Sequence, residues 1–529
     1  MANKKFFADV NKELITDPDA EFNVSVTENG GVGYRTTGKS ILDTFYKVSS
    51  LRKADEDDLK NIWNTMCKDN EDLAIQFLFF VGDIRGGVGE RRVFRTMFKE
   101  FCTISPNKAA YFINLVPTYS RWDILWDLIG INDTIDEKIA DVVRDQLAED
   151  IDNMKKGKSI SLLGKWMPSY NTSSAETRLK AVKLAKILYH FDMNSPIAQK
   201  MYRKTLSSLR KYLKVVETTI SANEWDKIDY EAVPSKANIL YKDAFMKHDE
   251  ERRKKYLQDL SEGKATVNSS VAFPCDIVAK YYNKVFSCRV PFIEEEDTLL
   301  EEMWKNLPDY NTGDENDDTI CVLDTSGSMH SNLNNSMNVL MVADSIVAYF
   351  TDHSKSEFSK NNVIAYAGDP YLIDLKDCKS LKDKLNKMND EEINAYNTDI
   401  VKVFGLILQT AIRNKYTQED IPSRVVVVSD MEFDQAFKNG ESRVFKVIEN
   451  HFKENGYKLP KLVFWNTCSR TNTIPVVENE AGVILISGFS ANTMKMVLSD
   501  KTDPMEALLE TLSAERYQPV RDAIAEASK

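Results

Sequence analysis

Five short apolar runs, most of them rich in valine and isoleucine, follow one another after residue 318 and limit the possible folds more than any other feature. The runs are TICVLD, NVIAYAG, RVVVVSD, KLVFWN and GVILIS. Helical patterns lie among them, near 334–350, 379–388, 399–413 and 441–455. Short buried strands that alternate with helices form a parallel sheet covered on both faces. We therefore predict a doubly wound, Rossmann-like α/β domain over residues 319–500.

The first run ends at Asp324, and the turn that follows offers two hydroxyl groups, those of Ser326 and Ser328. In an open α/β sheet, ligands bind at the carboxyl ends of the strands. Gly327 allows the sharp turn that these three side chains need in order to converge. A hard cation such as Mg²⁺ prefers oxygen ligands of this kind. An ordinary turn that caps a helix is the alternative interpretation.

Two further oxygen donors occur later in the chain at comparable positions. Thr398 precedes a helical pattern in NTDIVKVF, and Asp430 ends the run RVVVVSD. If both join the first turn, three loops at one edge of the sheet surround a cation. We therefore predict a site for Mg²⁺, or for another divalent cation such as Mn²⁺, made by Asp324, Ser326, Ser328, Thr398 and Asp430.

Upstream of the sheet, the pattern is mostly helical from Ser40 to about Ile293. Apolar residues recur at spacings of three and four in segments such as SILDTFYKVSSL, EDLAIQFLFFVGDI and WDILWDLIG. Successive amphipathic helices of similar length suggest helix pairs stacked as a HEAT-like α-solenoid. We predict a multidomain α plus α/β chain, with the solenoid over 1–307, an acidic linker over 308–318, the α/β domain over 319–500 and a helical tail over 501–529.

Length and composition bound the class of protein. A chain of 529 residues is too long for a single core. It has no run of 18 apolar residues, so we expect no membrane-spanning helix. The seven cysteines are scattered without a C-x-x-C pair, and the first residues lack the apolar core of a signal peptide. These features predict reduced thiols and a cytoplasmic location.

The distribution of charge is uneven. The formal net charge is −12, yet residues 153–216 hold 14 Lys and Arg against Glu176 and Asp192, a balance of +12 that leaves −24 for the remainder. Such asymmetry points to a polyanionic partner, whereas a solvated helix face balanced by acidic neighbours over 134–152 is the alternative. Our candidates for RNA contacts are Lys165, Lys200, Arg203, Lys204, Arg210, Lys211 and Lys214.

Two glycine-rich segments resemble phosphate-binding turns. Residues 33–40, GYRTTGKS, match the nucleotide-binding pattern G-x-x-x-x-G-K-[ST]. That loop belongs to a parallel sheet, which the following helical region does not supply, so we interpret it as a turn and expect no nucleotide cofactor. Residues 82–95, GDIRGGVGERRVFR, are either a helix corner, which we favour, or a phosphate-binding turn.

Aromatic residues and possible catalytic groups give weaker signals. Trp122 and Trp126 lie four apart on a helical pattern and are expected in the core, whereas Trp166 lies in the basic segment and could stack on an unpaired base. No histidine or lysine close to Ser326 in the sequence could act as its base, and G-x-S-x-G is absent. We therefore expect no enzymatic activity.

Several segments resemble known families. DTSGS after a strand resembles the metal-ion-dependent adhesion site (MIDAS) of von Willebrand factor A domains, which implies magnesium at the five residues predicted above; Asn397 stands where that family usually has glycine. Helices followed by such a domain resemble the TROVE family of Ro autoantigens. The segments GDIRGGVGERRVFR, SRWDILWDL, LLGKWMPSYNTSS and VVVVSDMEFDQA resemble the uncharacterised "domain of unknown function 2828" family, which combines a TROVE-like region with an A domain.

These resemblances imply a function. The Ro resemblance implies a ring of helix pairs, closed by the A domain, that binds structured or misfolded noncoding RNA in a ribonucleoprotein. A protein ligand with an acidic residue could complete the metal site. We therefore expect a cytoplasmic, non-enzymatic RNA-binding protein with a magnesium-dependent A domain and no membrane partner. A metal-dependent protein–protein docking scaffold without RNA is the alternative.

Overall fold

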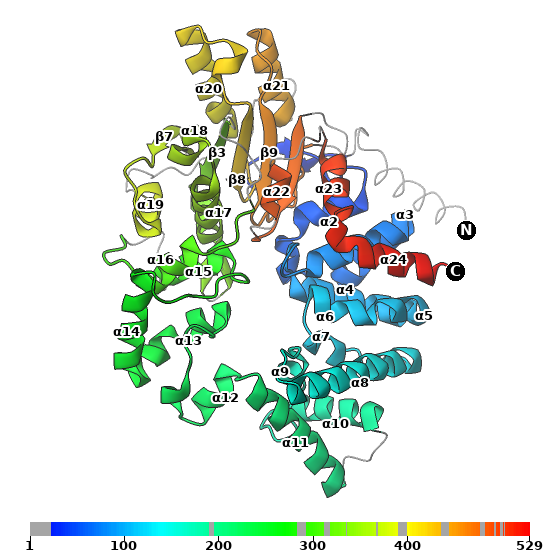
Figure 1. The fold of residues 1–529 in the computed structure, drawn as a ribbon. Helices are drawn as coiled ribbons and strands as arrows, with labels where there is room; N and C mark the ends of the chain where they lie inside the picture. The colour runs from blue at the N-terminus through cyan, green and yellow to red at the C-terminus, as the bar shows by residue number, and fades with distance from the viewer. Residues whose placement is uncertain are drawn as a thin grey trace, which may run out of the picture. The chain divides into compact units, whose positions relative to one another are not determined.

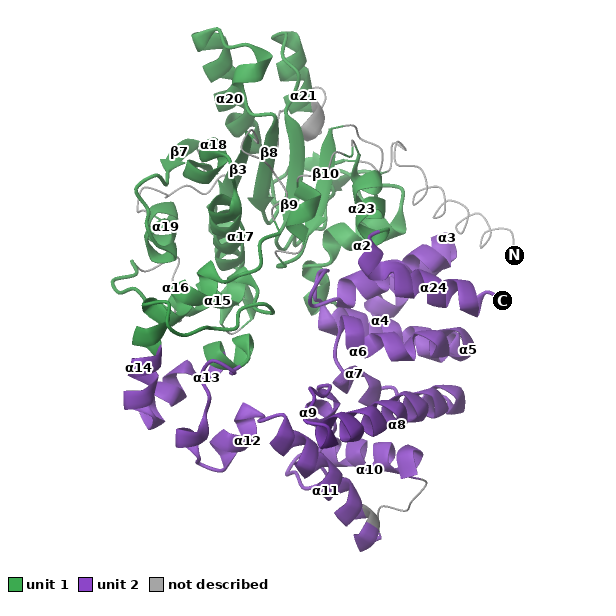
Figure 2. Ribbon diagram, in the orientation of Figure 1, with its two compact units in different colours: residues 1–54, 234–239, 257–513 green, residues 55–233, 240–256, 514–529 purple. Residues whose placement is uncertain are grey.

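The computed structural model describes residues 23–189, 195–282, 292–310, 318–334, 336–366, 369–389, 399–434, 444–476, 482–490, 493–497, 501 and 503–529. The chain forms two compact units, coloured separately in Figure 2. The first comprises residues 1–54, 234–239 and 257–513, and the second comprises residues 55–233, 240–256 and 514–529. The units therefore interleave along the chain, whereas the predicted domains follow one another in order.

The first unit is built on a six-stranded sheet with the strand order β10–β9–β8–β3–β6–β7. Its strands are β3 (Thr319–Asp324), β6 (Asn362–Tyr366), β7 (Tyr371–Asp374), β8 (Arg424–Ser429), β9 (Lys461–Asn466) and β10 (Val483–Ser487). All neighbours pair in parallel except β7, which runs antiparallel to β6. Each of the predicted apolar runs forms a strand. The sequence pattern did not predict β7, because this edge strand is mostly exposed.

The order of the strands reverses inside this sheet. The chain leaves β3 toward β6 and β7, and then returns past β3 to form β8, β9 and β10. Right-handed connections therefore place the helix between β3 and β6 and the helix between β8 and β9 on opposite faces, so the sheet is doubly wound, as predicted. Ligands of open α/β sheets bind where the order reverses, outside the carboxyl ends of the strands. Here that position lies between β3 and β8.

Helix α17 (Val339–His353) lies at the centre of the first unit, beside β3 in Figure 1. It packs on β3 and β8 and also on α15 (Pro274–Tyr281). Every residue from Val339 to Thr351 is buried, which explains why apolar residues predominate on all sides of the helix. Further helices of this unit are α2 (Ser40–Lys47), α16 (Thr298–Lys305), α18 (Glu357–Asn361), α19 (Leu381–Met388), α20 (Ile400–Asn414), α21 (Val444–Glu454), α22 (Met494–Val497) and α23 (Pro504–Leu512).

A short N-terminal hairpin belongs to the sheet-containing unit. Strands β1 (Ser25–Val26) and β2 (Val32–Gly33) pair antiparallel, and Gly30 and Tyr34 form bridges to Asp434 and Ile474. Glycine is needed at this contact, because a Cβ on Gly33 would lie 2.6 Å from the carbonyl oxygen of Ile474. This pairing is the physical reason that residues before the helical region cluster with the sheet.

The second unit is helical. Helices α3 (Glu56–Gly82), α4 (Arg91–Ile104), α8 (Asp133–Lys155) and α10 (Ala175–Tyr189) lie in successive layers, with α5 (Pro106–Ala109) between α4 and α8 (Figure 1). α11 (Pro196–Tyr212) packs on α8 and α9 (Leu163–Trp166), and α24 (Gln518–Ala527) packs on α3. Shorter helices are α6 (Val116–Tyr119), α7 (Asp123–Trp126) and α12 (Val216–Ser221). α13 (Ser235–His248) and α14 (Glu250–Ser261) are divided between the units.

Aromatic side chains form the core between the first helices of the second unit. The ring of Phe79 lies 5.4–5.9 Å from the rings of Phe94, Phe98, Phe112 and Tyr119. Trp126 of α7 and Trp122, the residue before that helix, are both buried, as predicted. The predicted multidomain α plus α/β fold class is therefore confirmed, whereas closure into a ring stays a prediction. In the described part of the chain, no helix combines the length and apolarity needed to cross a bilayer.

Candidate functional site

The predicted metal site lies at the carboxyl ends of two neighbouring parallel strands. β3 pairs with β8 up to Leu323 opposite Val428, so Asp324 and Asp430 leave the same edge of the sheet. This edge is the point where the strand order reverses. The topology therefore brings together two carboxylates that lie far apart in the sequence.

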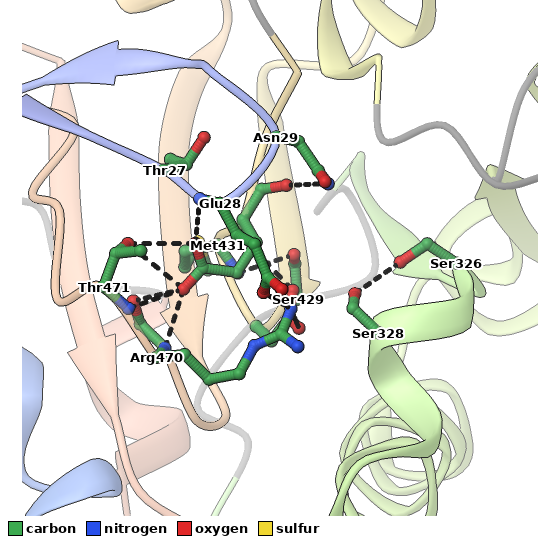
Figure 3. Close-up of polar contacts among 12 residues, drawn as sticks. Thr27, Glu28, Asn29, Ser326, Ser328, Ser429, Met431, Arg470 and Thr471 are labelled. Carbon is green, nitrogen blue, oxygen red and sulfur yellow. Dashed lines mark hydrogen bonds and ion pairs between the residues drawn. The ribbon is translucent and has the colours of Figure 1, made fainter.

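The turn after β3 places its two hydroxyl groups side by side. The amide of Ser326 donates to Oδ1 of Asp324 at 2.9 Å, and the Oγ atoms of Ser326 and Ser328 lie 2.9 Å apart (Figure 3). A 3-10 helix, Gly327–His330, follows directly. Gly327 allows this turn but is not needed for it, because Gly327 has no positive φ and a Cβ there would meet no atom within 4 Å.

Both carboxylates are fully buried and held by neighbouring donors. Oδ2 of Asp324 accepts hydrogen bonds from Oγ of Ser429 at 2.5 Å and from the hydroxyl of Tyr366 at 3.4 Å. Oδ1 of Asp430 accepts from the amide of Glu432 at 3.3 Å. These contacts fix the carboxylate orientations, as the surroundings of metal ligands commonly do.

The electrostatics of the pair favour a cation. Burial raises the pKa of Asp324, and burial together with the negative charge of Asp324 raises the pKa of Asp430. A hydrogen bond from Ser328 and the charge of Arg470 shift the pKa of Asp430 in the opposite direction. Two carboxylates in one dry site repel each other when both are ionised, and a divalent cation would remove that repulsion.

The donor set fits a small, hard cation. Adjacent ligands of an octahedral Mg²⁺ site, each about 2.0–2.1 Å from the metal, lie about 2.9 Å apart. The Oγ atoms of Ser326 and Ser328 have that separation. Among the described residues, no group of three or more His, Cys, Asp or Glu could hold a metal, so a cation at this position would need the hydroxyl groups or water as further ligands. Thr398 lies outside the described residues, and its predicted role stays a prediction.

Sequence reasoning missed several residues at the site, and only one of them carried a local signal. Ser429 directly precedes a predicted ligand, so its position in RVVVVSD could have indicated it. Tyr366 ends β6, a neighbour of β3, and could be inferred only once the strand order was known. Arg470 and Glu28 come from other loops, and the Nη2 atom of Arg470 lies 2.6 Å from Oε2 of Glu28 and 3.5 Å from Oδ2 of Asp430. Contacts between loops of this kind depend on the tertiary fold.

The GYRTTGKS turn is held by hydrogen bonds to side chains of the turn and of the helix that follows it. The amide of Thr37 donates to Oδ1 of Asp43 at 2.6 Å, and the hydroxyl of Thr36 donates to Oδ2 at 2.5 Å. The amides of Gly38 and Lys39 donate to the hydroxyls of Thr36 and Thr37. The preceding strand β2 pairs antiparallel with β1. The amides of Thr37, Gly38 and Lys39, which would face a phosphate, thus already have partners in the turn itself or in α2.

The predicted RNA contacts lie in the second unit, mostly on α11. Arg203 is exposed and donates to the carbonyl of Gln199 at 3.3 Å. No Asp or Glu occurs between Pro196 and Tyr212. The exposed members of the predicted set are Lys200, Arg203, Lys204, Lys211 and Lys214.

Two members of the predicted set, Arg210 and Lys165, bind other residues of the second unit. Arg210 donates to the carbonyls of Gly164 and Met167 at 3.0 and 2.7 Å and to the hydroxyl of Ser169 at 2.7 Å. Burial lowers the pKa of Arg210. Nζ of Lys165 lies 3.3 Å from Oε1 of Glu217. Arg210 therefore holds the turn around α9 to α11, and the exposed positive charge lies on α11 itself.

Trp166 keeps one ring face near a cation. The guanidinium carbon of Arg121 lies 3.9 Å from the centre of the Trp166 ring, and the Trp166 carbonyl accepts a hydrogen bond from Nε1 of Trp126 at 2.9 Å. Arg121 also forms an ion pair with Asp123. Nζ of Lys165 also lies 5.7 Å from the centre of this ring, and stacking of a base on Trp166 stays a prediction.

Comparison with known proteins supports the resemblance. Residues 134–310 match the family model "Domain of unknown function (DUF2828)", and residues 318–525 match "Domain of unknown function (DUF7788)". The uncharacterized protein L728 of Acanthamoeba polyphaga mimivirus is 29% identical over 541 residues, covering 94% of this chain and 89% of that protein. The crystal structure of the Deinococcus radiodurans Ro (RSR) protein is similar to this chain with 12% sequence identity and a TM-score of 0.35. The match covers 89% of this chain and 93% of that chain.

The solved structure is too distant to support an inference about function, and the fold described above rests on the strands and helices of this chain. The family match is independent of that structure. It begins at α8 in the helical region and ends just before the sheet begins. The predicted resemblance to the DUF2828 family is therefore confirmed, and the chain carries a DUF2828 region followed by a DUF7788 region.

Proposed function

We propose that this chain is a non-enzymatic binding protein with a divalent-cation site in its first unit and an RNA-binding face on α11 in its second. The observation that carries the metal site is the convergence of Asp324, Ser326, Ser328 and Asp430 at the ends of β3 and β8. The donors are all oxygen atoms, which suits Mg²⁺ or Mn²⁺. When bound, the cation would offer an open coordination position to an acidic side chain of a protein ligand.

The metal site is tested by titrating the purified full chain with Mn²⁺ and following the free ion by electron paramagnetic resonance. Asp324→Asn should weaken Mn²⁺ binding by more than about 100-fold, because it removes a charged ligand. Ser328→Ala keeps both carboxylates and should weaken binding less, and it covers the case in which the first variant folds poorly. Asp374→Asn removes an exposed carboxylate at the end of β7 and serves as the matched control. Equal Mn²⁺ binding by the wild type and Asp324→Asn would contradict this site.

The RNA proposal rests on the exposed basic face of α11. Lys200, Lys204 and Lys211 are exposed, and the helix has no acidic residue to balance them. Side chains of this kind bind phosphate groups, and affinity then depends on charge more than on sequence. The protein would hold noncoding or misfolded RNA mainly through the phosphate groups of the RNA backbone.

Purification at moderate salt, followed by the 260/280 nm absorbance ratio and sequencing of bound nucleic acid, tests this proposal. Reversal of Lys200, Lys204 and Lys211 to Glu should remove the copurified RNA. Reversal of Lys68, Lys99 and Lys255, which are exposed elsewhere in the second unit, changes the net charge equally and should leave RNA bound. Wild-type protein free of nucleic acid would favour the alternative, a metal-dependent docking scaffold, provided that Mn²⁺ binds.

A further inference from the structure

The N-terminal hairpin is fixed beside the metal site by one buried carboxylate, that of Glu432. Its Oε2 accepts the amide of Glu28 at 2.8 Å, and its Oε1 accepts the amides of Arg470 and Thr471 at 2.7 and 2.9 Å (Figure 3). The side chain of Asn29 adds a hydrogen bond to the carbonyl of Glu432 at 2.7 Å. Glu432 therefore holds the backbones of Glu28 and Arg470 next to each other, independently of their own side chains.

The side chains of Glu28 and Arg470 extend this contact to the metal site. A single nitrogen, Nη2 of Arg470, lies 2.6 Å from Oε2 of Glu28 and 3.5 Å from Oδ2 of Asp430. The guanidinium thus lies between a carboxylate of the hairpin and a carboxylate of the proposed metal shell, and it is closer to the hairpin. Glu28 and Arg470 are 55% and 39% exposed, whereas Asp430 is fully buried, so the pair lies between solvent and the buried carboxylate.

A guanidinium at this position competes with a metal ion. Arg470 brings a positive charge to the oxygen of Asp430 that a divalent cation would use. The guanidinium and a cation bound at that oxygen would repel each other. Any group that draws the guanidinium away from Asp430 lowers that repulsion and frees the oxygen. Glu28 is placed to do so, because its contact with Arg470 is the shorter of the two.

We propose that Glu28 is a positioning residue for the metal site: it draws Arg470 toward the hairpin, weakens the contact of Arg470 with Asp430 and thereby raises the affinity of the site for a divalent cation. Docking of the N-terminal hairpin then controls how readily the site takes up metal. Arg470 is the built-in competitor, and Glu28 acts through it and not on the cation itself. This inference rests on the proposed metal site.

The test is a double-mutant cycle in the full chain, with Mn²⁺ affinity as the measurement. Arg470→Gln should bind Mn²⁺ about tenfold more tightly, because the competing charge is gone. Glu28→Gln should bind it several-fold more weakly, because Arg470 then turns to Asp430. In the double variant, the Glu28→Gln effect should disappear, and the affinity should equal that of Arg470→Gln. Lys458→Gln removes an exposed positive charge just before β9, at the opposite edge of the sheet, and serves as the control.

The outcomes separate this inference from the metal site itself. An equal loss of affinity from Glu28→Gln with and without Arg470 would mean that Glu28 acts on the cation directly, which overturns the proposal. Unchanged affinity in both single variants, with binding still lost in Asp324→Asn, overturns the role of the pair but leaves the metal site intact. No Mn²⁺ binding by any variant overturns both. Hydrogen exchange of residues 25–34 checks that the hairpin stays docked, since Glu432 holds its backbone.

Discussion

Asp344 on α17 is a buried carboxylate whose two oxygens have unequal surroundings. Oδ2 accepts hydrogen bonds from the hydroxyl of Tyr282 at 2.6 Å and from Nδ2 of Asn389 at 3.0 Å. Oδ1 has no hydrogen-bond partner among the described residues. An ionised carboxylate with one unpaired oxygen is costly to bury. The protonation of Asp344 should therefore affect the stability of the first unit.

The first prediction concerns the pH dependence of that stability. Burial raises the pKa of Asp344 from 3.8 to about 6, although the hydrogen bonds from Tyr282 and Asn389 act in the opposite direction. Since the folded pKa exceeds the unfolded one, the stabilisation from the protonated group is present at low pH and is lost as pH rises through about 6. Asp344→Asn cannot ionise, so its free energy of unfolding relative to wild type should rise by up to about 3 kcal/mol between about pH 4 and pH 8.

Urea denaturation at both pH values measures this difference. Asp374→Asn, an exposed aspartate of the same unit, should show no comparable pH dependence relative to wild type. A stability difference between Asp344→Asn and wild type that is the same at both pH values would contradict the prediction.

A second prediction concerns the hydrogen bonds of Glu432. This buried carboxylate accepts the amides of Glu28, Arg470 and Thr471 and the hydroxyls of Ser469 and Thr471. Glu432→Ala leaves those donors without their acceptor and should lower the free energy of unfolding by about 3 kcal/mol. Faster hydrogen exchange of residues 25–34 would show release of the hairpin. Glu454→Ala, at an exposed position at the end of α21, should change neither quantity.

At the scale of residues, the sequence predicted which side chains meet at the ends of β3 and β8, because that signal is local; their role as metal ligands stays a prediction. Asp324, Ser326 and Ser328 lie at the end of one strand and in the turn after it, and Asp430 follows a second strand that is equally apolar. The apolar pattern of the strands and the turn residues were therefore sufficient to place these four side chains together. Glu28, Arg470 and Glu432 meet because separate loops dock on one another. No periodicity or spacing in the sequence encodes that docking.

The glycine-rich corner between α3 and α4 shows how an element is anchored by distant residues. Asp83 ends α3, is fully buried and accepts hydrogen bonds from the amide of Arg85 at 3.0 Å and from Nη2 of Arg516 at 2.7 Å. The hydroxyl of Tyr517 donates to Oδ2 of Asp83 at 3.1 Å. A Cβ on Gly87 would lie 2.1 Å from the carbonyl oxygen of Phe80, so glycine is required there. The segment is thus a helix corner that receives the residues before α24, which supports the favoured interpretation.

Removal of that anchor gives a third prediction. Asp83→Ala leaves Arg516 and Tyr517 without their shared acceptor and should destabilise the second unit by about 2–3 kcal/mol, a value reduced by the partial exposure of Arg516. Hydrogen exchange should rise over α24. Asp522→Ala, which removes an exposed carboxylate from α24, is the matched control and should have little effect. Unchanged exchange over α24 in Asp83→Ala would show that the apolar packing of this helix holds it without the anchor.

At the scale of elements, the strands and most helices were predictable because their apolar periodicity is strong. The prediction erred where tertiary contacts decide the boundaries. WDILWDLIG reads as a helix, yet α7 spans only Asp123–Trp126, because the tryptophans are buried by neighbouring segments and the chain turns at once. The two predicted helical segments on either side of Asn70 remain distinct within α3, because Asn70 has non-helical φ and ψ angles and its side chain accepts a hydrogen bond from the amide of Leu73 at 3.0 Å. The burial that a helix receives from its neighbours cannot be read from its own sequence.

For the whole molecule, the structure shows which part of the basic segment is balanced. Nζ of Lys180 lies 2.6 Å from Oδ1 of Asp127, Lys165 pairs with Glu217, and Lys156 pairs with Asp152. Helix α8 and its neighbours thus neutralise part of the +12 charge, as the alternative interpretation anticipated. The exposed cations of α11 show no such ion pairs among the described residues, and the rest of the chain is acidic. A polyanion would therefore meet favourable charge over a restricted surface.

The final prediction follows from that restriction. If RNA binds the exposed cations of α11, about four phosphates are neutralised, and the logarithm of the association constant should fall against the logarithm of salt concentration with a slope of about −3. Changing Lys200, Lys204 and Lys211 to Gln should reduce the magnitude of this slope by about 2, because each lysine that binds a phosphate displaces about 0.7 counterions from the RNA. Filter binding of a structured RNA over a salt series measures both slopes. Changing Lys68, Lys99 and Lys255 to Gln alters the net charge equally, so an equal reduction there would mean that RNA senses the overall charge of the chain and not the face of α11.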